Sequence, residues 1–433
     1  MCSIAGAPTK KEVAEMLAIM KHRAPDDVGI ISDEQFCIGM GRLKILDLNS
    51  PNLCPITDGN LVLTYNGEIY NYLELREELI QLGYEFNTES DSEVLLKAYK
   101  EWGIGCLDKL NGMFAFAIYD GNKIFLSRDI AGEKPLYYRK GNFAFASEAK
   151  ALGKCMEFPP AHYGIYDFKT LELHRWWFPP TKESDMELEQ AVNELDVLLQ
   201  SSVSLRTRAH VPYALFKSGG IDSTLISTYH DFQHNYTYED KDYKEEFLKV
   251  FPKILWHLDY PAKTFSAFGF WKLAEEASKE VKVILSGEGA DELFGGYVRY
   301  VPNEFNRIAR REFPSYKEMF PYRDMLREEF HGNMRELLRM GDRMAGAWGI
   351  ENRCPFLDRR IIEFAMSLPM HLKIDGLKTK IVLRELLKRR SPSYQFEEKK
   401  GLYCSVNEWI GSKQTYQKDD YLKYQKQLCK SVL

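Results

Sequence analysis

Residues 176–184, Trp-Trp-Phe-Pro-Pro-Thr-Lys-Glu-Ser, divide the chain into two parts with different hydrophobic periodicity. Before this stretch, short apolar runs are separated by Asp-Gly and Lys-Gly turns; after it, apolar runs lead through glycine-rich turns into helical patterns. The 433 residues are enough for two or three ordinary domains. We therefore expect one domain over residues 1–178 and a second over residues 186–433.

The first part is expected to form two packed antiparallel sheets with helices outside. Candidate strands are residues 36–40, 61–65, 114–119, 123–127 and 142–146. Amphipathic spacing predicts helices over residues 11–21, 72–82 and 91–102. Many short strands interrupted by a few helices favour an α+β domain over a parallel α/β unit.

The second part is expected to be an α/β domain with a doubly wound parallel sheet. A helical pattern covers residues 186–202, and a strand at 211–216 runs through Gly219 and Gly220 into a helix. Another strand, at 281–285, leads into a second glycine-rich turn. Strands that pass through such turns into helices are typical of doubly wound folds. The polar segment 413–433 is expected to be a surface tail.

Composition excludes several classes of function. The net charge of −5 is too small to favour nucleic acid or a membrane surface as a partner. No apolar run approaches the roughly 18 residues of a spanning helix, and MCSIAGAPTKKEV lacks the layout of a signal peptide, so we expect a cytosolic protein. The eight cysteines form no CxxC pair and are expected to be reduced.

Cys2 differs from the other cysteines because it lies next to the amino terminus. Removal of Met1 would leave Cys2 with a free α-amine whose ordinary pKa is about 7.7–8.0. That amine can take the proton of the thiol, so one residue would supply both nucleophile and base. The alternative is an accidental cysteine at a disordered end.

Eight motifs favour the catalytic interpretation. They are MCSIAG at the start, HRAPDD at 22–27, GRLKILDL at 41–48, YNGEIYNYLELREEL at 65–79, ESDSEVLL at 89–96, LNGMFAFAIYD at 110–120, SRDIAGEKPLYY at 127–138 and FASEAKAL at 145–152. In this order they resemble the class II, N-terminal-nucleophile glutamine amidotransferases of the asparagine synthetase type. The resemblance implies an Ntn-hydrolase-like fold and hydrolysis of glutamine at Cys2.

The same resemblance assigns roles around Cys2. Asn66 and the backbone N–H of Gly67 would stabilise the oxyanion, a contribution worth about 2.7–4 kcal/mol per donor. Arg42 and Leu46 would bind glutamine, with the Arg42 fork on its carboxylate, and Glu68 and Asp91 would hold its ammonium. Without the motifs, surface ion pairing would explain Arg42 and Asp91.

One position departs from the family. Ala24 stands where glycine is usual, which would strain a positive-φ turn by about 1 kcal/mol.

In the second part, VPYALFKSGGIDSTLI at 211–226 and SGEGADELFGGY at 286–297 resemble the phosphate loop and second signature of the ATP pyrophosphatases. Glycine-rich turns between a strand and a helix present backbone N–H groups to an anion. The implied ATP-binding residues are Ser218, Gly219, Gly220, Asp222, Ser223, Ser286 and Gly287. Asp222 and Asp291 are candidate Mg²⁺ ligands, since this cation prefers carboxylate oxygen.

Two further residues carry chemistry by resemblance. Glu288 would take a proton from ammonia as it attacks an acyl-adenylate, and Lys380, in KTKIVLRELL at 378–387, would stabilise charge on phosphorus during adenylation. An isolated lysine there would otherwise belong to a solvated helix face. The implied substrates are glutamine, aspartate and ATP, with Mg²⁺ as cofactor and asparagine, AMP, pyrophosphate and glutamate as products.

The second half also departs from the family in two places. The stretch at 225–255 is shorter than usual, and Asn352 and Cys354 stand where the family prefers other residues. These departures leave open the amidation of a different carboxylate, as in secondary metabolism or polysaccharide modification. A regulatory or glutaminase-only relative is the remaining alternative. The sequence does not fix the oligomeric state; a homodimer is one alternative.

Overall fold

The computed structural model describes residues 1–433 except 52, 261–265, 298–299, 301–321 and 397–433. The 413–433 segment, expected to be a surface tail, lies outside the described residues.

Two six-stranded antiparallel sheets form the first part of the chain. The first sheet has the order β10 (Met156–Glu157), β8 (Tyr137–Arg139), β9 (Ala144–Ala146), β1 (Ser3–Ala7), β3 (Cys37–Arg42) and β2 (Asp27–Ser32). The second has the order β12 (Leu171–Arg175), β11 (His162–Tyr166), β7 (Ile124–Arg128), β6 (Gly112–Tyr119), β5 (Leu61–Ile69) and β4 (Ile56–Asp58). Ile4 and Ile38 of the first sheet pack against Ala115 and Leu126 of the second. The predicted pair of packed sheets is confirmed.

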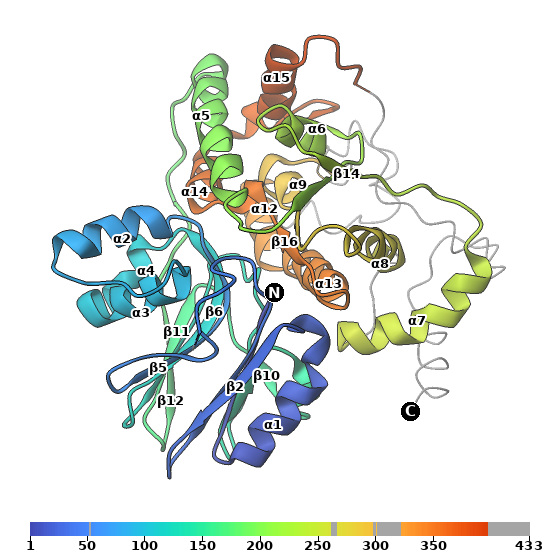
Figure 1. The fold of residues 1–433 in the computed structure, drawn as a ribbon. Helices are drawn as coiled ribbons and strands as arrows, with labels where there is room; N and C mark the ends of the chain where they lie inside the picture. The colour runs from blue at the N-terminus through green and yellow to red at the C-terminus, as the bar shows by residue number, and fades with distance from the viewer. Residues whose placement is uncertain (52, 261–265, 298–299, 301–321, 397–433) are drawn as a thin grey trace.

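Helices cover the outer faces of both sheets (Figure 1). Helix α1 (Lys10–Ile19) lies on the first sheet, where Val13 and Leu17 join a core with Ala5. On the second sheet lie α2 (Tyr72–Gln81), α3 (Asp91–Trp102) and the short α4 (Cys106–Lys109). The three helices expected from amphipathic spacing are present, and their ends lie within two residues of the predicted ones.

A four-stranded parallel sheet organises the second part, in the order β14 (His234–Tyr236), β13 (Tyr213–Phe216), β15 (Val283–Leu285) and β16 (Glu351–Arg353). The helices are α5 (Leu188–Arg206), α6 (Ile221–Ser227), α7 (Lys244–Leu258), α8 (Ser266–Ala277), α9 (Ala290–Phe294), α12 (Tyr322–His331), α13 (Asn333–Gly346), α14 (Arg359–Ser367) and α15 (Ile381–Arg390). A two-stranded ribbon of β17 (Ile374–Asp375) and β18 (Lys378–Thr379) precedes α15.

Helices pack on both faces of this sheet, as the doubly wound prediction requires. Leu215 and Leu285 face a core shared with α5, α14 and α15, whereas Phe216 and Ile284 face α7, α8 and α13. The chain leaves β13 for β14 on one side and then returns to β15 on the other. In open α/β sheets, ligands bind at the carboxyl ends of the strands where the order reverses in this way. This rule makes the carboxyl ends of β13 and β15, the two central strands, a candidate ligand-binding site.

Among the described residues, no helix combines the length and apolar character that crossing a membrane requires.

Candidate active sites and the contact between them

Cys2 and Asn66 meet between the two sheets of the first part. Cys2 immediately precedes β1, and its backbone nitrogen donates to Asn66 Oδ1 over 3.0 Å. Asn66 is completely buried on β5, and its Nδ2 has no hydrogen-bond partner among the described residues. Burial raises the pKa of the Cys2 thiol, so a neighbouring base is needed to form the thiolate.

Gly67 follows Asn66 where the backbone of β5 lies close against β6. A Cβ at position 67 would lie 2.2 Å from the carbonyl oxygen of Met113, so no larger residue fits without movement. The side chain of Asn66 and the backbone of Gly67 are therefore neighbouring groups that can both contact a ligand. This arrangement matches the two predicted oxyanion donors in position, while their role stays a prediction.

Arg42 and Asp91 are buried, which excludes surface ion pairing as their explanation. Arg42 Nη2 donates to the carbonyl oxygens of Leu46 and Asp47, both over 2.8 Å, so Arg42 and Leu46 are in contact, while their binding of glutamine stays a prediction. Asp91 accepts from the Tyr65 hydroxyl over 2.8 Å and from the Ile69 nitrogen over 3.0 Å. These bonds hold Asp91, at the start of α3, against the end of β5.

Ala24 is not strained. Its φ is −139°, in a region that any residue adopts, so the anticipated cost of alanine is absent.

The Ser-Gly-Gly loop of the second part follows β13 and leads into α6. The Ser218 and Ser223 hydroxyls are 3.2 Å apart, and the Gly220 nitrogen lies 3.4 Å from Ser218 Oγ. Gly219 has φ +74°, which an L-residue with a side chain adopts only at a cost. The loop that begins with Ser286 and Gly287 follows the adjacent strand β15. Both predicted ATP loops therefore lie at the carboxyl ends of the neighbouring strands β13 and β15.

Lys380 connects the two predicted metal ligands. Its Nζ lies 2.6 Å from both Asp222 carboxylate oxygens and 2.7 Å from Asp291 Oδ1. Although burial favours the neutral amine, Asp222 and Asp291 raise the pKa of Lys380. A solvated helix face is therefore the wrong explanation for Lys380, since its side chain is buried between two carboxylates.

Glu288 lies in the same loop as Ser286 and contacts β16. Glu288 Oε2 accepts a hydrogen bond from Asn352 Nδ2 over 2.7 Å and lies 3.6 Å from Cys354 Sγ. Burial raises the pKa of Glu288 to about 7. A carboxyl group with such a pKa is suited to accept a proton near neutral pH.

Strand β16 also reaches the residues that are predicted to bind glutamine. Arg353, fully buried, donates from Nη2 to Glu68 Oε2 over 2.9 Å and from Nε to Glu351 Oε1 over 2.9 Å. Because side chains alternate along a strand, Glu351 and Arg353 face the first part of the chain while Asn352 faces Glu288. A single short strand thus contacts both predicted sites.

Further buried charges join the two parts. Arg23 donates to Asp342 on α13 over 2.8 and 3.1 Å and to Glu148 over 3.1 Å. Arg343 donates to the same Glu148 oxygen over 3.1 Å. Figure 1 places the N-terminus at this junction, and Met1 packs there, since a Cβ at Gly346 would lie 2.5 Å from its Cε atom.

Sequence reasoning missed the roles of Arg353, Glu351, Arg23 and Asp342. Arg23 lies in the HRAPDD motif, and Glu351 and Arg353 flank Asn352, one of the departures from the family. Arg23 and Asp342 are 319 residues apart in the sequence, and Arg353 and Glu68 are 285 apart, so the motifs alone gave neither pairing.

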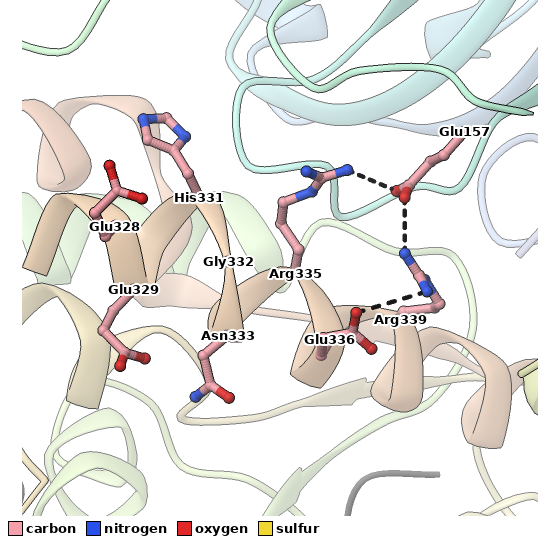
Figure 2. A pocket seen from close by; sticks show the side chains of 9 residues that line it. All are labelled: Glu157, Glu328, Glu329, His331, Gly332, Asn333, Arg335, Glu336 and Arg339. Carbon is pink, nitrogen blue, oxygen red and sulfur yellow. Dashed lines mark hydrogen bonds and ion pairs between the residues drawn. The ribbon is translucent and has the colours of Figure 1, made fainter. Parts of the chain in front are cut away.

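A separate cavity of about 460 Å³ lies where α12 meets α13, and Glu157 of β10 lines it (Figure 2). Figure 2 shows the Glu157 carboxylate between Arg335 and Arg339, at 3.1 and 2.7 Å. None of the predicted site residues lines this cavity. Its charged groups join the two parts of the chain a second time.

Each of the two parts of the chain matches a known protein family. Residues 1–177 match the glutamine amidotransferase domain family, and residues 194–240, 233–336 and 321–426 match the asparagine synthase family. The chain is 30% identical to asparagine synthetase B [glutamine-hydrolyzing] of Escherichia coli, over 91% of this chain and 80% of that protein. It is 32% identical to a probable asparagine synthetase [glutamine-hydrolyzing] of Schizosaccharomyces pombe, over 84% and 74%.

A third relative, asparagine synthetase [glutamine-hydrolyzing] 1 of Bacillus subtilis, is 28% identical over 93% of this chain and 85% of that protein. The first two matched segments of the asparagine synthase family overlap at residues 233–240, within the 225–255 stretch. The architecture, the two sites and these matches lead to one conclusion: the chain belongs to the family of glutamine-hydrolysing asparagine synthetases.

Proposed function

We propose that the protein makes asparagine from aspartate, glutamine and ATP. Residues 1–178 would form the glutaminase and residues 186–433 the synthetase. The observation that carries the proposal is the double contact of β16, where Arg353 bonds Glu68 of the glutamine pocket and Asn352 bonds Glu288 of the ATP site. Two chemically distinct sites that share one strand are suited to consecutive steps.

In the glutaminase, Cys2 acts after removal of Met1. The freed α-amine takes the thiol proton, and the thiolate attacks the amide carbon of glutamine. Asn66 and the Gly67 backbone N–H stabilise the oxyanion, and their rigid placement avoids reorganisation during the reaction. The carbon–nitrogen bond then breaks, and ammonia leaves with the proton that the amine returns to it. Water hydrolyses the resulting thioester, which releases glutamate and restores the Cys2 thiol.

Glutamine is oriented by four side chains. The Arg42 fork binds its α-carboxylate, with Leu46 beside it, and Glu68 and Asp91 hold its α-ammonium. Glu68 is suited to this role because its Oε1 has no hydrogen-bond partner among the described residues. Arg353 holds the other oxygen of Glu68 and so orients it.

In the synthetase, the phosphates of ATP lie on the two loops at the β13–β15 edge. The residues are Ser218, Gly219, Gly220, Asp222, Ser223, Ser286 and Gly287. The aspartate β-carboxylate attacks the α-phosphorus, and pyrophosphate leaves. Lys380 stabilises the negative charge that develops on phosphorus.

The residues present fit Mg²⁺. Asp222 and Asp291 both lie within 2.7 Å of one atom, Lys380 Nζ, so their oxygens converge on a common space. Mg²⁺ is commonly held by one or two carboxylates together with substrate phosphates, and it would neutralise phosphate charge there.

Ammonia then attacks the acyl-adenylate, and Glu288 takes the proton. AMP leaves as the carbon–nitrogen bond forms. Ammonia needs a protected route between the sites, because in water at pH 7 it is mostly protonated and not nucleophilic. Met113, which packs with Tyr70 and with Leu205 of α5 where the two parts meet, is suited to line this route, whereas Phe114 and Phe116 pack between the second sheet and helices α2 and α3.

The test is mass spectrometry of the products formed from glutamine, aspartate and Mg-ATP. The proposal predicts asparagine, AMP, pyrophosphate and glutamate. Glutamate alone would contradict it, and an acceptor screen that measures AMP would then identify another carboxylate. The cytosolic location and the homodimer stay predictions.

A further inference from the structure

Asn352 is a buried amide with one half of its hydrogen-bonding capacity in use. Its Nδ2 donates to Glu288 Oε2 over 2.7 Å, and the residue is 7% exposed. Its Oδ1 is buried and has no hydrogen-bond partner among the described residues. Leaving a buried amide oxygen without a hydrogen-bond partner costs free energy of folding. This cost favours a ligand as the missing partner.

The orphaned oxygen lies beside the Glu288 carboxylate. Both amide atoms are attached to the same carbon, so Oδ1 is one amide width from the atom that bonds Glu288. Two acceptors, a neutral amide oxygen and a carboxylate, therefore lie within a few ångströms of each other beside β16.

Helix α13 leaves room for this pair. A Cβ added at Gly341 would lie 2.9 and 3.0 Å from the two Glu288 oxygens and 3.2 Å from Asn352 Nδ2. Any side chain at position 341 would crowd the Glu288 carboxylate and the Asn352 amide. The glycine therefore allows them to lie directly against the helix backbone.

Weak donors cover the remaining sides. Cys354 Sγ is 3.6 Å from Glu288 Oε2, and Ser286 Oγ is 3.5 Å from the same atom. Neither the thiol nor the hydroxyl reaches Asn352 Oδ1 with a hydrogen bond among the described contacts. Apart from Asn352, only this thiol and this hydroxyl have hydrogen bonds to Glu288 among the described residues, so both acceptors keep capacity for a ligand.

A third acceptor belongs to the first part of the chain. Glu133 is buried, and its Oε2 also has no hydrogen-bond partner among the described residues. Burial and Asp129 raise the pKa of Glu133 to about 8. Burial, Glu288 and Glu133 together raise the pKa of the Cys354 thiol, so Glu133 lies close enough to act on Cys354.

A ligand that suits two adjacent acceptors is small and rich in N–H donors. Ammonia has three N–H bonds and one lone pair. If two N–H bonds donate to the amide and carboxylate oxygens, the lone pair stays free to attack. Water, with its two O–H donors, fits the same pair and would be displaced as ammonia enters.

We infer that Asn352 Oδ1 and the Glu288 carboxylate form a docking site for ammonia beside β16. This inference rests on the proposed function. It gives a binding role to Asn352, a residue that departs from the family pattern. From the site, the nitrogen lone pair forms the bond to the acyl carbon. The bond from that carbon to AMP oxygen breaks, and one ammonia proton passes to Glu288.

The test compares Asn352→Ala with wild type in ammonium-dependent synthesis at saturating ATP and aspartate. Loss of one hydrogen bond to ammonia is expected to raise the KM for ammonium about 3- to 10-fold. The KM values for ATP and aspartate should stay within twofold. With glutamine as donor, more glutamate should be released per asparagine, because ammonia is captured less often.

Asn235→Ala is the matched control. Asn235 lies on β14 of the same sheet and donates its amide to the Phe232 carbonyl over 2.9 Å, but its side chain is exposed. Its removal should change none of these constants. Asn352→Ser, which keeps a shorter acceptor, should give an intermediate KM for ammonium and provides a second variant if alanine does not fold.

Aspartate-dependent exchange of pyrophosphate into ATP reports a folded synthetase without using ammonia. An unchanged KM for ammonium in a variant with normal exchange overturns the docking site. A wild-type protein that makes neither asparagine nor AMP from ammonium overturns the proposed function instead.

Discussion

Replacing Arg353 with methionine removes the cation that joins β16 to the glutamine pocket. Arg353 is fully buried and makes the only ion pair that Glu68 has among the described residues. Glu351 keeps Lys134 at 3.5 Å, so Glu68 is the carboxylate left without compensation. Breaking a buried pair in this way costs about 3–5 kcal/mol if the remaining group stays charged.

Protonation of Glu68 offers the variant a way to lower that cost. Burial already raises the pKa of Glu68, and Arg353 opposes this effect, so loss of Arg353 favours the neutral acid further. A neutral Glu68 loses a charge-assisted bond to the α-ammonium of glutamine, worth about 1.5–3 kcal/mol. The KM for glutamine should therefore rise about 10- to 150-fold.

The assay is glutamate release as a function of glutamine concentration, with thermal melting to confirm folding. Arg208→Met is the matched control, because Arg208 makes a more exposed pair with Glu74 and should change the KM little. The double variant Glu68→Gln, Arg353→Met should melt higher than Arg353→Met, since no buried carboxylate is left alone. A folded Arg353→Met protein with a KM within threefold of wild type would refute the reasoning.

Three further predictions follow from the other contacts. Lys380→Met should lower asparagine synthesis at least 100-fold, about 2.7 kcal/mol of lost charge stabilisation, while glutamate release without ATP persists; equal loss of both activities would contradict the separate sites. With unprotonated ammonia held constant, ammonium-dependent kcat should fall as pH drops through about 7, because Glu288 must be ionised to accept a proton; a flat profile would exclude it as the base. Although burial favours the neutral acid, three arginines hold the pKa of Glu157 at about 2. The ion pairs of Glu157 therefore stabilise the folded protein fully above pH 4.5, and this contribution is lost as pH falls toward 2. Glu157→Gln should thus lower the melting temperature at pH 7 and differ less from wild type at pH 3; a difference that does not shrink would contradict this.

Much of the architecture follows from local pattern. Amphipathic spacing predicts the helix at 91–102 with both of its ends, and in the structure Ser90 caps it and Gly103 ends it. The loops at 218–223 and 286–287 were also recognisable, since glycines between an apolar strand and a helix have a direct physical meaning. Even the convergence of Asp222 and Asp291 followed from their position after parallel strands.

The contacts between the two parts of the chain did not follow from local pattern. Strand β16 is only three residues long, too short for a periodic signal, and its flanking sequence reads equally well as a loop. Arg353, Arg23 and Asp342 resemble surface charges until their distant partners are known. Asn352 and Cys354 were visible as departures from the family, but only the position of Glu288 gives them a chemical meaning.

The most direct test of a two-site enzyme follows the amide nitrogen of glutamine. Wild type and Cys2→Ala are incubated with amide-¹⁵N glutamine, unlabelled ammonium, aspartate and Mg-ATP, and asparagine is analysed by mass spectrometry. The account predicts ¹⁵N in the asparagine of wild type, and only unlabelled asparagine from Cys2→Ala at the ammonium-dependent rate of wild type. Loss of both routes in Cys2→Ala, or labelled asparagine from it, would contradict the account.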